Sequence, residues 1–349
     1  MSMAHKKTTY QYLHDKFGDH APDFELTLKA ELVDEIQTLK KTRNAVVLGH
    51  NYMEQVLYDT IPDFRGDSLA LSRQAAQTDK DVIVFCGVKF MAETAKILNP
   101  NKTVLIPSLK AGCSLAESIT AGDVRELRKR FPGVPIVSYV NTYADVKAES
   151  DVCCTSSNAA QVVRLTLKKW KSDKVIFLPD EFLARNVAQE LGVSIIIPKK
   201  IASAGTRTAR GQLVGWTGRC VVHEQFTTED IKRVRTEYSD VLVFAHPECS
   251  PDVIRASDFS GSTTAMINEV NKHQGKPILL LTECSMGDNI IASNPQTNIL
   301  RLCMVRCPYM NQITLKDTRD ALKYMQYQVH VPENVRVKAE IAVQRMIAI

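Results

Sequence analysis

Short apolar runs alternate with amphipathic stretches over most of this chain. The runs 46–48, 82–85 and 104–106 each end in glycine, proline or polar residues, and residues 68–77 and 92–98 between them have helical spacing. Apolar runs of this length, bounded by turn residues, are typical of buried strands, and their alternation with helices indicates a parallel sheet. The pattern therefore predicts an α/β fold.

The same alternation returns twice further along the chain. The second set is expected to have strands at 135–139, 175–178 and 193–197 and helices at 158–170 and 183–191. The third set is expected to have strands at 241–246 and 278–281 and a helix at 264–270. We therefore predict three similar α/β units of roughly 90 residues with short parallel sheets, in a pseudo-threefold triangular arrangement.

Helical segments are expected at both ends of the chain. Leu28, Leu32, Ile36 and Leu39 recur at helical spacing, which predicts one face that docks on the body. The expected organisation is a helical extension over 1–40, α/β units over 41–132, 133–219 and 220–312, and C-terminal helices over 313–349 that pack on the body. We expect no chemistry from the terminal helices.

Polar residues stand where the first strand of each unit ends. His50, Tyr139 and His246 are each followed about 17 residues later by a hydroxyl residue that opens a helix, namely Ser68, Ser156 and Thr263. Ligands of parallel α/β sheets bind at the carboxyl ends of strands, where helix N-termini offer free N–H groups. The alternative is that these serines and threonines are ordinary helix caps.

Further functional groups follow these strand ends. Asn51 and Tyr52 come after His50, Asn141 comes after Tyr139, and Glu248 comes after His246. Histidine, tyrosine and glutamate side chains are suited to proton transfer. A structural histidine or a core tyrosine is the competing interpretation for each of them taken alone.

Nine cysteines are scattered along the chain, and no secretory signal precedes them. The odd number and the missing signal argue against a disulfide framework. Cys307 precedes Pro308, which favours an extended turn with the thiol presented outward. Cys113 and Cys220 each follow a glycine closely. A buried free thiol is the simplest interpretation of any one of them, but the three together predict convergence on one metal cluster.

Composition narrows the class of protein. The content of 44% hydrophobic residues allows a large core, and the net charge of +5 is too small and too dispersed for nucleic-acid binding. No apolar run is long enough for a membrane helix or a signal peptide, so a cytoplasmic protein is expected. Dinucleotide-binding and P-loop motifs, Cys-x-x-Cys pairs and a radical-SAM cysteine triplet do not occur.

Taken together, the motifs of this chain resemble those of the quinolinate synthase family. The resemblance runs in order from about residue 44 to 346. It is carried by residues 49–52, 66–68, 91–93, 111–116, 139–142, 155–159, 220–224, 246–249, 260–263 and 307–310.

The resemblance implies three α/β domains around a [4Fe–4S] cluster held by Cys113, Cys220 and Cys307. The other cysteines, at 86, 153, 154, 249, 284 and 303, would not be ligands. Some members have a Cys-x-x-Cys-x-x-Cys segment near the C-terminus. Here Cys303 and Cys307 are separated by three residues, which argues against a regulatory disulfide of that spacing.

The resemblance also implies a transferase reaction of de novo NAD synthesis, in which iminoaspartate condenses with dihydroxyacetone phosphate to give quinolinate, phosphate and water. L-aspartate oxidase is the implied supplier of the imine. Three thiolates leave one iron of the cluster without a protein ligand, so that iron can act as a Lewis acid. The implied acid/base residues are Tyr52 and Glu248, assisted by His50 and His246, and His223 lies near a ligand cysteine. The implied substrate-binding residues are His50, Ser68, Tyr139, Asn141, Ser156, His246, Glu248 and Thr263.

Three other functions remain open from the residues alone. An aconitase-like hydratase would also use a cluster with an open iron, but it would lack this set of motifs. An iron–sulfur redox sensor would not need His50, Tyr52 or Glu248. A mononuclear zinc site at cysteine and histidine positions is the third alternative.

Overall fold

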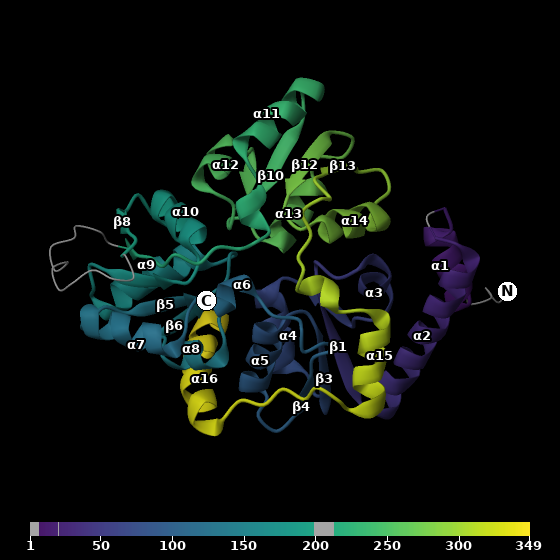
Figure 1. Ribbon diagram of the computed structural model, residues 1–349, viewed down its shortest axis with the longest axis horizontal. Helices are drawn as coiled ribbons and strands as arrows, with labels where there is room; N and C mark the ends of the chain where they lie inside the picture. The colour runs from purple at the N-terminus through teal and green to yellow at the C-terminus, as the bar shows by residue number, and fades with distance from the viewer. Residues whose placement is uncertain (1–6, 20, 199–212) are drawn as a thin grey trace.

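The computed structural model describes residues 7–19, 21–198 and 213–349. Three parallel sheets, each with its own helices, lie around a common centre (Figure 1). This arrangement confirms the predicted fold class of three similar α/β units.

The three sheets share the order of their first three strands, but the first and third sheets have four strands and the second has five. The first has the order β2-β1-β3-β4, the third has the order β11-β10-β12-β13, and the second has the order β6-β5-β7-β9-β8, in which β9 lies between β7 and the edge strand β8. In sequence order their strands are β1 (Ala45–His50), β2 (Phe64–Gly66), β3 (Val82–Cys86), β4 (Thr103–Leu105), β5 (Ile136–Tyr139), β6 (Val152–Cys154), β7 (Val175–Leu178), β8 (Ile195–Ile196), β9 (Leu213–Val214), β10 (Leu242–Ala245), β11 (Phe259–Ser260), β12 (Pro277–Leu281) and β13 (Asn298–Arg301).

The register of the central strands is repeated as well. Val47 lies opposite Val84 in the first sheet, Val137 opposite Phe177 in the second and Val243 opposite Leu279 in the third. These residues are fully buried, as expected of strands that are covered by helices on both faces.

The helices of each unit also follow one order. A short helix precedes the edge strand, and two longer helices follow it. These are α3 (Gln55–Thr60), α4 (Ser68–Gln77) and α5 (Lys89–Leu98) in the first unit, α8 (Ala144–Ala148), α9 (Ala159–Trp170) and α10 (Glu181–Leu191) in the second, and α12 (Pro251–Ala256), α13 (Thr263–Val270) and α14 (Cys284–Ser293) in the third.

A basic residue on the helix before each first strand pairs with an aspartate before the edge strand. The helices are α2 (Asp23–Thr42), α7 (Ala121–Arg130) and α11 (Thr228–Glu237). The ion pairs are Lys40–Asp63 at 2.8 Å, Arg128–Asp151 at 3.1 Å and Arg235–Asp258 at 3.0 Å. Each aspartate also accepts a backbone N–H of the first strand at 2.8 Å. Through these contacts α2 packs in the first unit in the same way as α7 and α11 pack in the second and third units. The domain limits given above remain a prediction.

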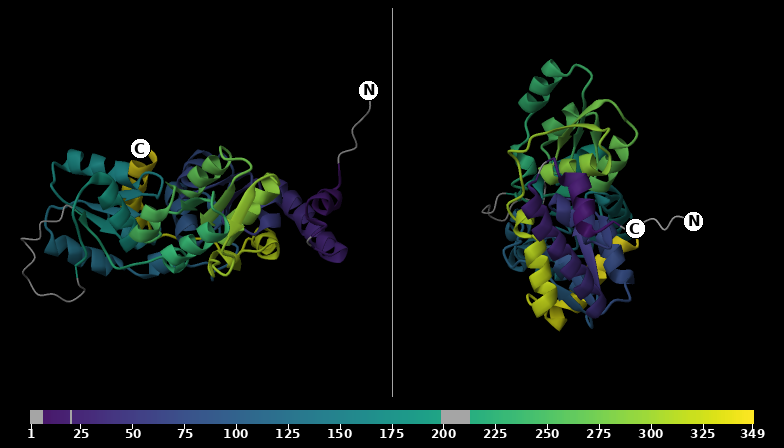
Figure 2. Two further views of the ribbon diagram at one scale, coloured as in Figure 1. Left: turned by 90° about the horizontal axis from the view of Figure 1, so that it is seen from above. Right: turned by 90° about the vertical axis from the view of Figure 1, so that its right-hand side faces the viewer.

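The predicted inner face of the N-terminal helix is partly wrong. Ile36 is buried as expected, but Leu28 is 56% exposed. The buried face of α2 runs instead through Leu26, Ala30 and Val33. Alanine and valine at the right spacing define this face, whereas the expectation followed the larger leucines. The preceding helix α1 (Thr9–Phe17) lies at the outer edge of the molecule (Figure 2).

The two C-terminal helices connect different parts of the body. Helix α15 (Leu315–Tyr324) packs on α2 and β3 of the first unit. Helix α16 (Glu333–Ile347) packs on α8 and β6 of the second unit and on α5 of the first (Figure 1). Within the described residues no helix is long and apolar enough to cross a membrane.

Candidate active site

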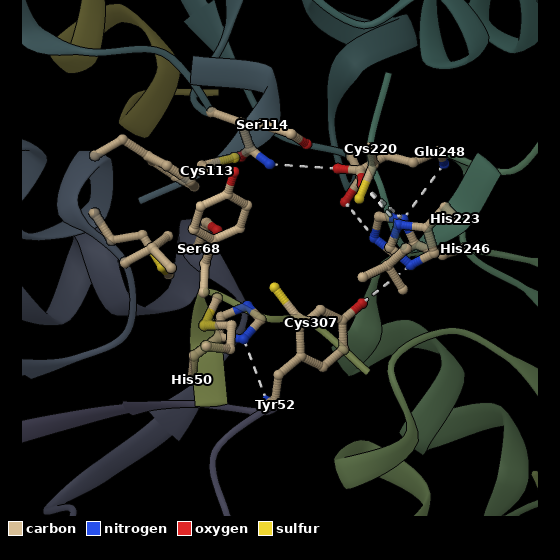
Figure 3. A pocket seen from close by; sticks show the side chains of 18 of the residues that line it. His50, Tyr52, Ser68, Cys113, Ser114, Cys220, His223, His246, Glu248 and Cys307 are labelled. Carbon is tan, nitrogen blue, oxygen red and sulfur yellow. Dashed lines mark hydrogen bonds and ion pairs between the residues drawn. The ribbon is translucent and has the colours of Figure 1, made fainter. Parts of the chain in front are cut away.

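One cavity lies where the three units meet (Figure 3). Its lining includes every site residue that the sequence predicted, which are His50, Tyr52, Ser68, Cys113, Tyr139, Asn141, Ser156, Cys220, His246, Glu248, Thr263 and Cys307. The structure thus brings together residues that are far apart in the chain, because the carboxyl ends of β1, β5 and β10 face the same centre. Asp67 and His223 line the cavity as well.

The three cavity cysteines belong to one repeated turn. Each begins the pattern Cys-x6-Thr-x2-Asp, at 113–123, 220–230 and 307–317. A single helical turn follows each cysteine, namely α6 (Ser114–Glu117), η2 (His223–Gln225) and η3 (Met310–Gln312). The threonine then caps the next helix by accepting the N–H of the aspartate. This repeat was not predicted, although the spacing of its cysteine, threonine and aspartate residues is visible in the sequence.

The repeated turn gives each sulfur the same surroundings. Two backbone N–H groups, from the second and third residues after the cysteine, donate to its sulfur. The donors are Leu115 and Ala116 for Cys113, Val222 and His223 for Cys220, and Tyr309 and Met310 for Cys307. Hydrogen bonds to sulfur are among the means by which proteins tune iron–sulfur clusters.

Burial raises the pKa of the Cys113 thiol to about 12 and that of the Cys307 thiol to about 11. A bound metal deprotonates a coordinating thiol outright. Three thiols from three sides of one cavity, each with two N–H donors, therefore fit a cluster with three protein ligands.

Side chains also connect the cysteine turns to each other. Ser114 Oγ donates to the Arg219 carbonyl at 3.2 Å and accepts the Val221 N–H at 3.3 Å, so one hydroxyl binds the backbone on both sides of Cys220. Tyr309 donates its hydroxyl to Glu117 at 3.3 Å, which joins the third turn to the first.

We call the three residues at the end of each first strand, 50–52, 139–141 and 246–248, the strand-end turns. In the first and third of these turns a histidine side chain binds the backbone. The Tyr52 N–H donates to His50 Nδ1 at 3.2 Å, and the Glu248 N–H donates to His246 Nδ1 at 3.3 Å. Burial lowers the pKa of His50 to about 4 and that of His246 to about 3. Both rings are therefore neutral at pH 7, with Nδ1 as acceptor and the proton on Nε2.

Glu248 is the buried carboxylate of the cavity. Tyr139 donates its hydroxyl to Oε1 at 2.6 Å, Asn141 Nδ2 lies 3.4 Å from the same oxygen, and His223 Nδ1 lies 2.7 Å from Oε2. Burial alone would raise the pKa of Glu248. The adjacent His223 and the hydrogen bonds from His223 and Tyr139 outweigh burial, so the pKa lies below its usual value.

A chain of hydroxyl and imidazole groups runs from this carboxylate to the first unit. His223 Nε2 lies 3.1 Å from Thr282 Oγ1 and 3.4 Å from the Tyr52 hydroxyl. The Tyr52 and Thr282 hydroxyls are 2.6 Å apart. Because Nδ1 of His223 donates to Glu248, Nε2 is the acceptor of this chain. Thr282 was missed in the sequence, although it is the first polar residue after β12.

The helix-opening residues Ser68 and Thr263 are not helix caps. Asp67 caps α4 and Ser262 caps α13, each by accepting a backbone N–H three residues on. The capping alternative is therefore wrong for these two, and their side chains line the cavity. Thr263 accepts from Asn51 Nδ2 at 2.8 Å.

Two further polar groups face the cavity. Ser156 Oγ lies 3.4 Å from His246 Nε2. Asn141 Oδ1 is buried and has no hydrogen-bond partner. A buried acceptor without a partner is costly, so a donor from a bound ligand would satisfy it.

The other cysteines lie outside the cavity lining. Cys86, Cys153, Cys154 and Cys249 are buried free thiols. Cys284 and Cys303 form a disulfide, which the sequence did not predict. A single pair is not the disulfide framework that the sequence argued against; it forms because the fold brings the start of α14 to the segment after β13.

Comparison with known proteins identifies one family over nearly the whole length of the chain. Residues 34–348 match the family model described as quinolinate synthetase A protein. A quinolinate synthase of Caulobacter vibrioides is 48% identical over 95% of this chain and 86% of the relative. Quinolinate synthase 2 of Mesorhizobium japonicum is 47% identical over 97% of both chains. A quinolinate synthase of Xylella fastidiosa is 48% identical over 96% of this chain and 92% of the relative. The chain therefore belongs to the quinolinate synthase family.

Proposed function

We propose that this protein condenses iminoaspartate with dihydroxyacetone phosphate to give quinolinate, phosphate and water. Membership of the family supports an enzyme of NAD biosynthesis. The convergence of the predicted residues on one cavity supports this particular chemistry.

Cys113, Cys220 and Cys307 would hold a [4Fe–4S] cluster in this cavity. Such a cluster supplies one iron that has no protein ligand and can act as a Lewis acid. The single observation that carries the proposal is the threefold repeat of the cysteine turn, with its two N–H donors to each sulfur.

Glu248 is the proposed general base. Its lowered pKa keeps it ionised at pH 7, and condensation followed by loss of water requires groups that remove protons from carbon and nitrogen. In the tautomer set by this pairing, His223 donates its Nδ1 proton to Glu248 at 2.7 Å, and its Nε2 can accept a proton from the hydroxyls of Thr282 and Tyr52.

Tyr52 is the proposed general acid. Burial raises the pKa of its hydroxyl well above the usual value, so the hydroxyl holds its proton until a strong base develops beside it. A departing hydroxide is such a base. Thr282 Oγ1 at 2.6 Å and His223 Nε2 at 3.4 Å would orient the Tyr52 hydroxyl.

The remaining side chains would bind and orient the substrates. The neutral His50 and His246 rings would present Nε2–H donors, and Ser68, Ser156 and Thr263 would add hydroxyl groups. Asn141 offers an acceptor that has no partner in the protein. These groups can pair with carboxylate, phosphate and imine groups without a net positive charge.

The test is an anaerobic assay for quinolinate, with iminoaspartate formed in the reaction by oxidation of aspartate. Iron and sulfide are counted on the same sample. We expect quinolinate formation in proportion to four irons per chain. Quinolinate formation by protein free of iron and sulfide, or a full cluster without quinolinate, would contradict the proposal.

A single zinc ion is the second candidate for the metal. Cys220, His223 and Glu248 present ligand atoms that all lie within 4.8 Å of one another, which suits zinc. The hydrogen bond between His223 and Glu248 explains much of this proximity. Zinc in place of iron in the same metal count would favour this candidate.

A further inference from the structure

The second unit holds its strand-end turn differently from the other two. In the first and third units, the residue that ends the strand is a histidine whose Nδ1 accepts a backbone N–H of its own turn. The equivalent residue of the second unit is Tyr139, whose hydroxyl donates to Glu248 instead. A phenol ring has no nitrogen beside the backbone, so this turn needs another support.

Lys147 supplies that support. Its Nζ donates to the Val140 carbonyl at 2.8 Å and also to the Thr142 carbonyl. The side chain is fully buried, and Nζ lies 5.5 Å from the centre of the Phe90 ring. A buried ammonium group is costly unless its donors are satisfied, and here backbone carbonyls satisfy them.

The position of Lys147 is also distinctive within the threefold pattern. It lies eight residues after Tyr139 on the short helix α8. The positions eight residues after His50 and His246 are occupied by Tyr58 and Ile254. Tyr58 reaches only the Asn51 side chain, at 3.4 Å, and in the third unit Pro247 itself restricts the turn.

The two carbonyls bound by Lys147 flank Asn141. Asn141 Nδ2 lies 3.4 Å from Glu248 Oε1, and its Oδ1 is buried without a partner beside the cavity. The direction of this amide depends on the backbone on both of its sides. Lys147 binds that backbone on both sides.

We propose that Lys147 is a positioning residue, which fixes Asn141 so that its Oδ1 can accept a hydrogen bond from a hydroxyl or imine N–H group of the substrates. This inference rests on the proposed function, since dihydroxyacetone phosphate is taken as a substrate. Lys147 acts through Asn141 and does not touch the ligand.

The test is a double-mutant cycle with Lys147→Met, Asn141→Ala and the double variant, on protein that contains its cluster. The readout is the dissociation constant of dihydroxyacetone phosphate, whose free hydroxyl is a hydrogen-bond donor, measured anaerobically by calorimetry. We expect each single change to weaken binding about tenfold and the double variant to be no weaker than Asn141→Ala. Lys147→Arg, which keeps a cation and several donors, should restore part of the affinity, and iron content should stay unchanged in all variants.

A purely structural lysine would give a different result. It would lower the urea midpoint without coupling to Asn141, so additive losses in the double variant would overturn the inference. Unaltered binding of dihydroxyacetone phosphate by a folded Lys147→Met variant would overturn it as well. Where the Met variant does not fold, Lys147→Gln takes its place in the cycle with the same expected coupling. Wild-type protein that does not bind dihydroxyacetone phosphate would overturn the proposed function, whereas normal wild-type binding with no coupling overturns only the role of Lys147.

Discussion

The cysteine turns and the strand-end turns surround the same cavity but differ in how far they follow the threefold repeat. The cysteine turns are alike in all three, with the same cap and the same two N–H donors to sulfur. The strand-end turns read His-Asn-Tyr, Tyr-Val-Asn and His-Pro-Glu. A cluster with three equivalent thiolates suits a symmetric site, whereas an asymmetric substrate needs different groups on each side.

Removing one cysteine should give the largest effect. Alanine in place of Cys113, Cys220 or Cys307 should abolish the cluster and reduce quinolinate formation by roughly 1000-fold or more, because the site loses one of three equivalent ligands. Iron, sulfide and visible absorption measure the cluster directly. Cys249→Ala is the matched control, since Cys249 is a buried thiol outside the cavity. A full cluster in one of the three variants would exclude that residue as a ligand.

Substitution of a residue in a strand-end turn should reduce turnover without loss of the cluster, which distinguishes the strand-end turns from the cysteine turns. Glu248→Gln removes the charge and keeps the size of the side chain, so turnover should fall by about 10²–10⁴-fold while the cluster remains. Loss of the cluster in this variant would show that the strand-end turns also hold the metal. Tyr139→Phe, which removes one hydrogen bond to the same carboxylate, should have a smaller effect on turnover.

Ser114 tests how the cysteine turns support each other. Ser114→Ala removes both hydrogen bonds to the backbone around Cys220, and loss of such supporting contacts typically costs about 10–100-fold in metal affinity. We expect faster loss of iron to a chelator in this variant. Ser118→Ala is the control, because the Ser118 hydroxyl donates only within its own turn, to Leu115. Equal rates for the two variants would contradict the supporting role of Ser114.

The smallest expected effect is on stability as a function of pH. Burial lowers the pKa of His50 to about 4 and of His246 to about 3, so both stay neutral in the folded protein while the unfolded chain takes up protons below about pH 6.5. The free energy of unfolding should therefore fall as the pH is lowered from 6.5 towards 4, by about 1 kcal/mol per pH unit for each histidine.

Urea unfolding of the metal-free protein between pH 7 and 4.5 measures this dependence. A variant with both His50→Gln and His246→Gln should show a shallower fall with pH. An identical pH dependence in the variant would mean that other groups control it.

The sequence predicted the central strands well, because apolar runs such as 175–178 and 278–281 are buried on both faces. It also predicted the helices α4, α5, α9, α10 and α13, but it did not predict α7, α11 and α14. It did not predict the edge strands β2, β6 and β11, which have only two or three residues each. Their pairing depends on the neighbouring first strand, not on their own apolar pattern.

For the site, the motifs indicated the predicted residues of the cavity, since these stand close after a strand end or a glycine or, for Cys307, directly before a proline. One member of the hydrogen-bonded chain was not predicted. Thr282 is a single threonine after an apolar run, and its role depends on Tyr52 and His223 from distant parts of the chain. The Cys284–Cys303 disulfide also arises from tertiary proximity, which spacing alone does not reveal.

Mössbauer spectroscopy of ⁵⁷Fe-labelled protein, with and without quinolinate, tests most directly whether three equivalent cysteines leave one iron free. The account predicts a four-iron cluster in which about one quarter of the signal changes when quinolinate is added, while the other three quarters stay the same. A spectrum in which all the irons respond alike, or in which none responds, would contradict it.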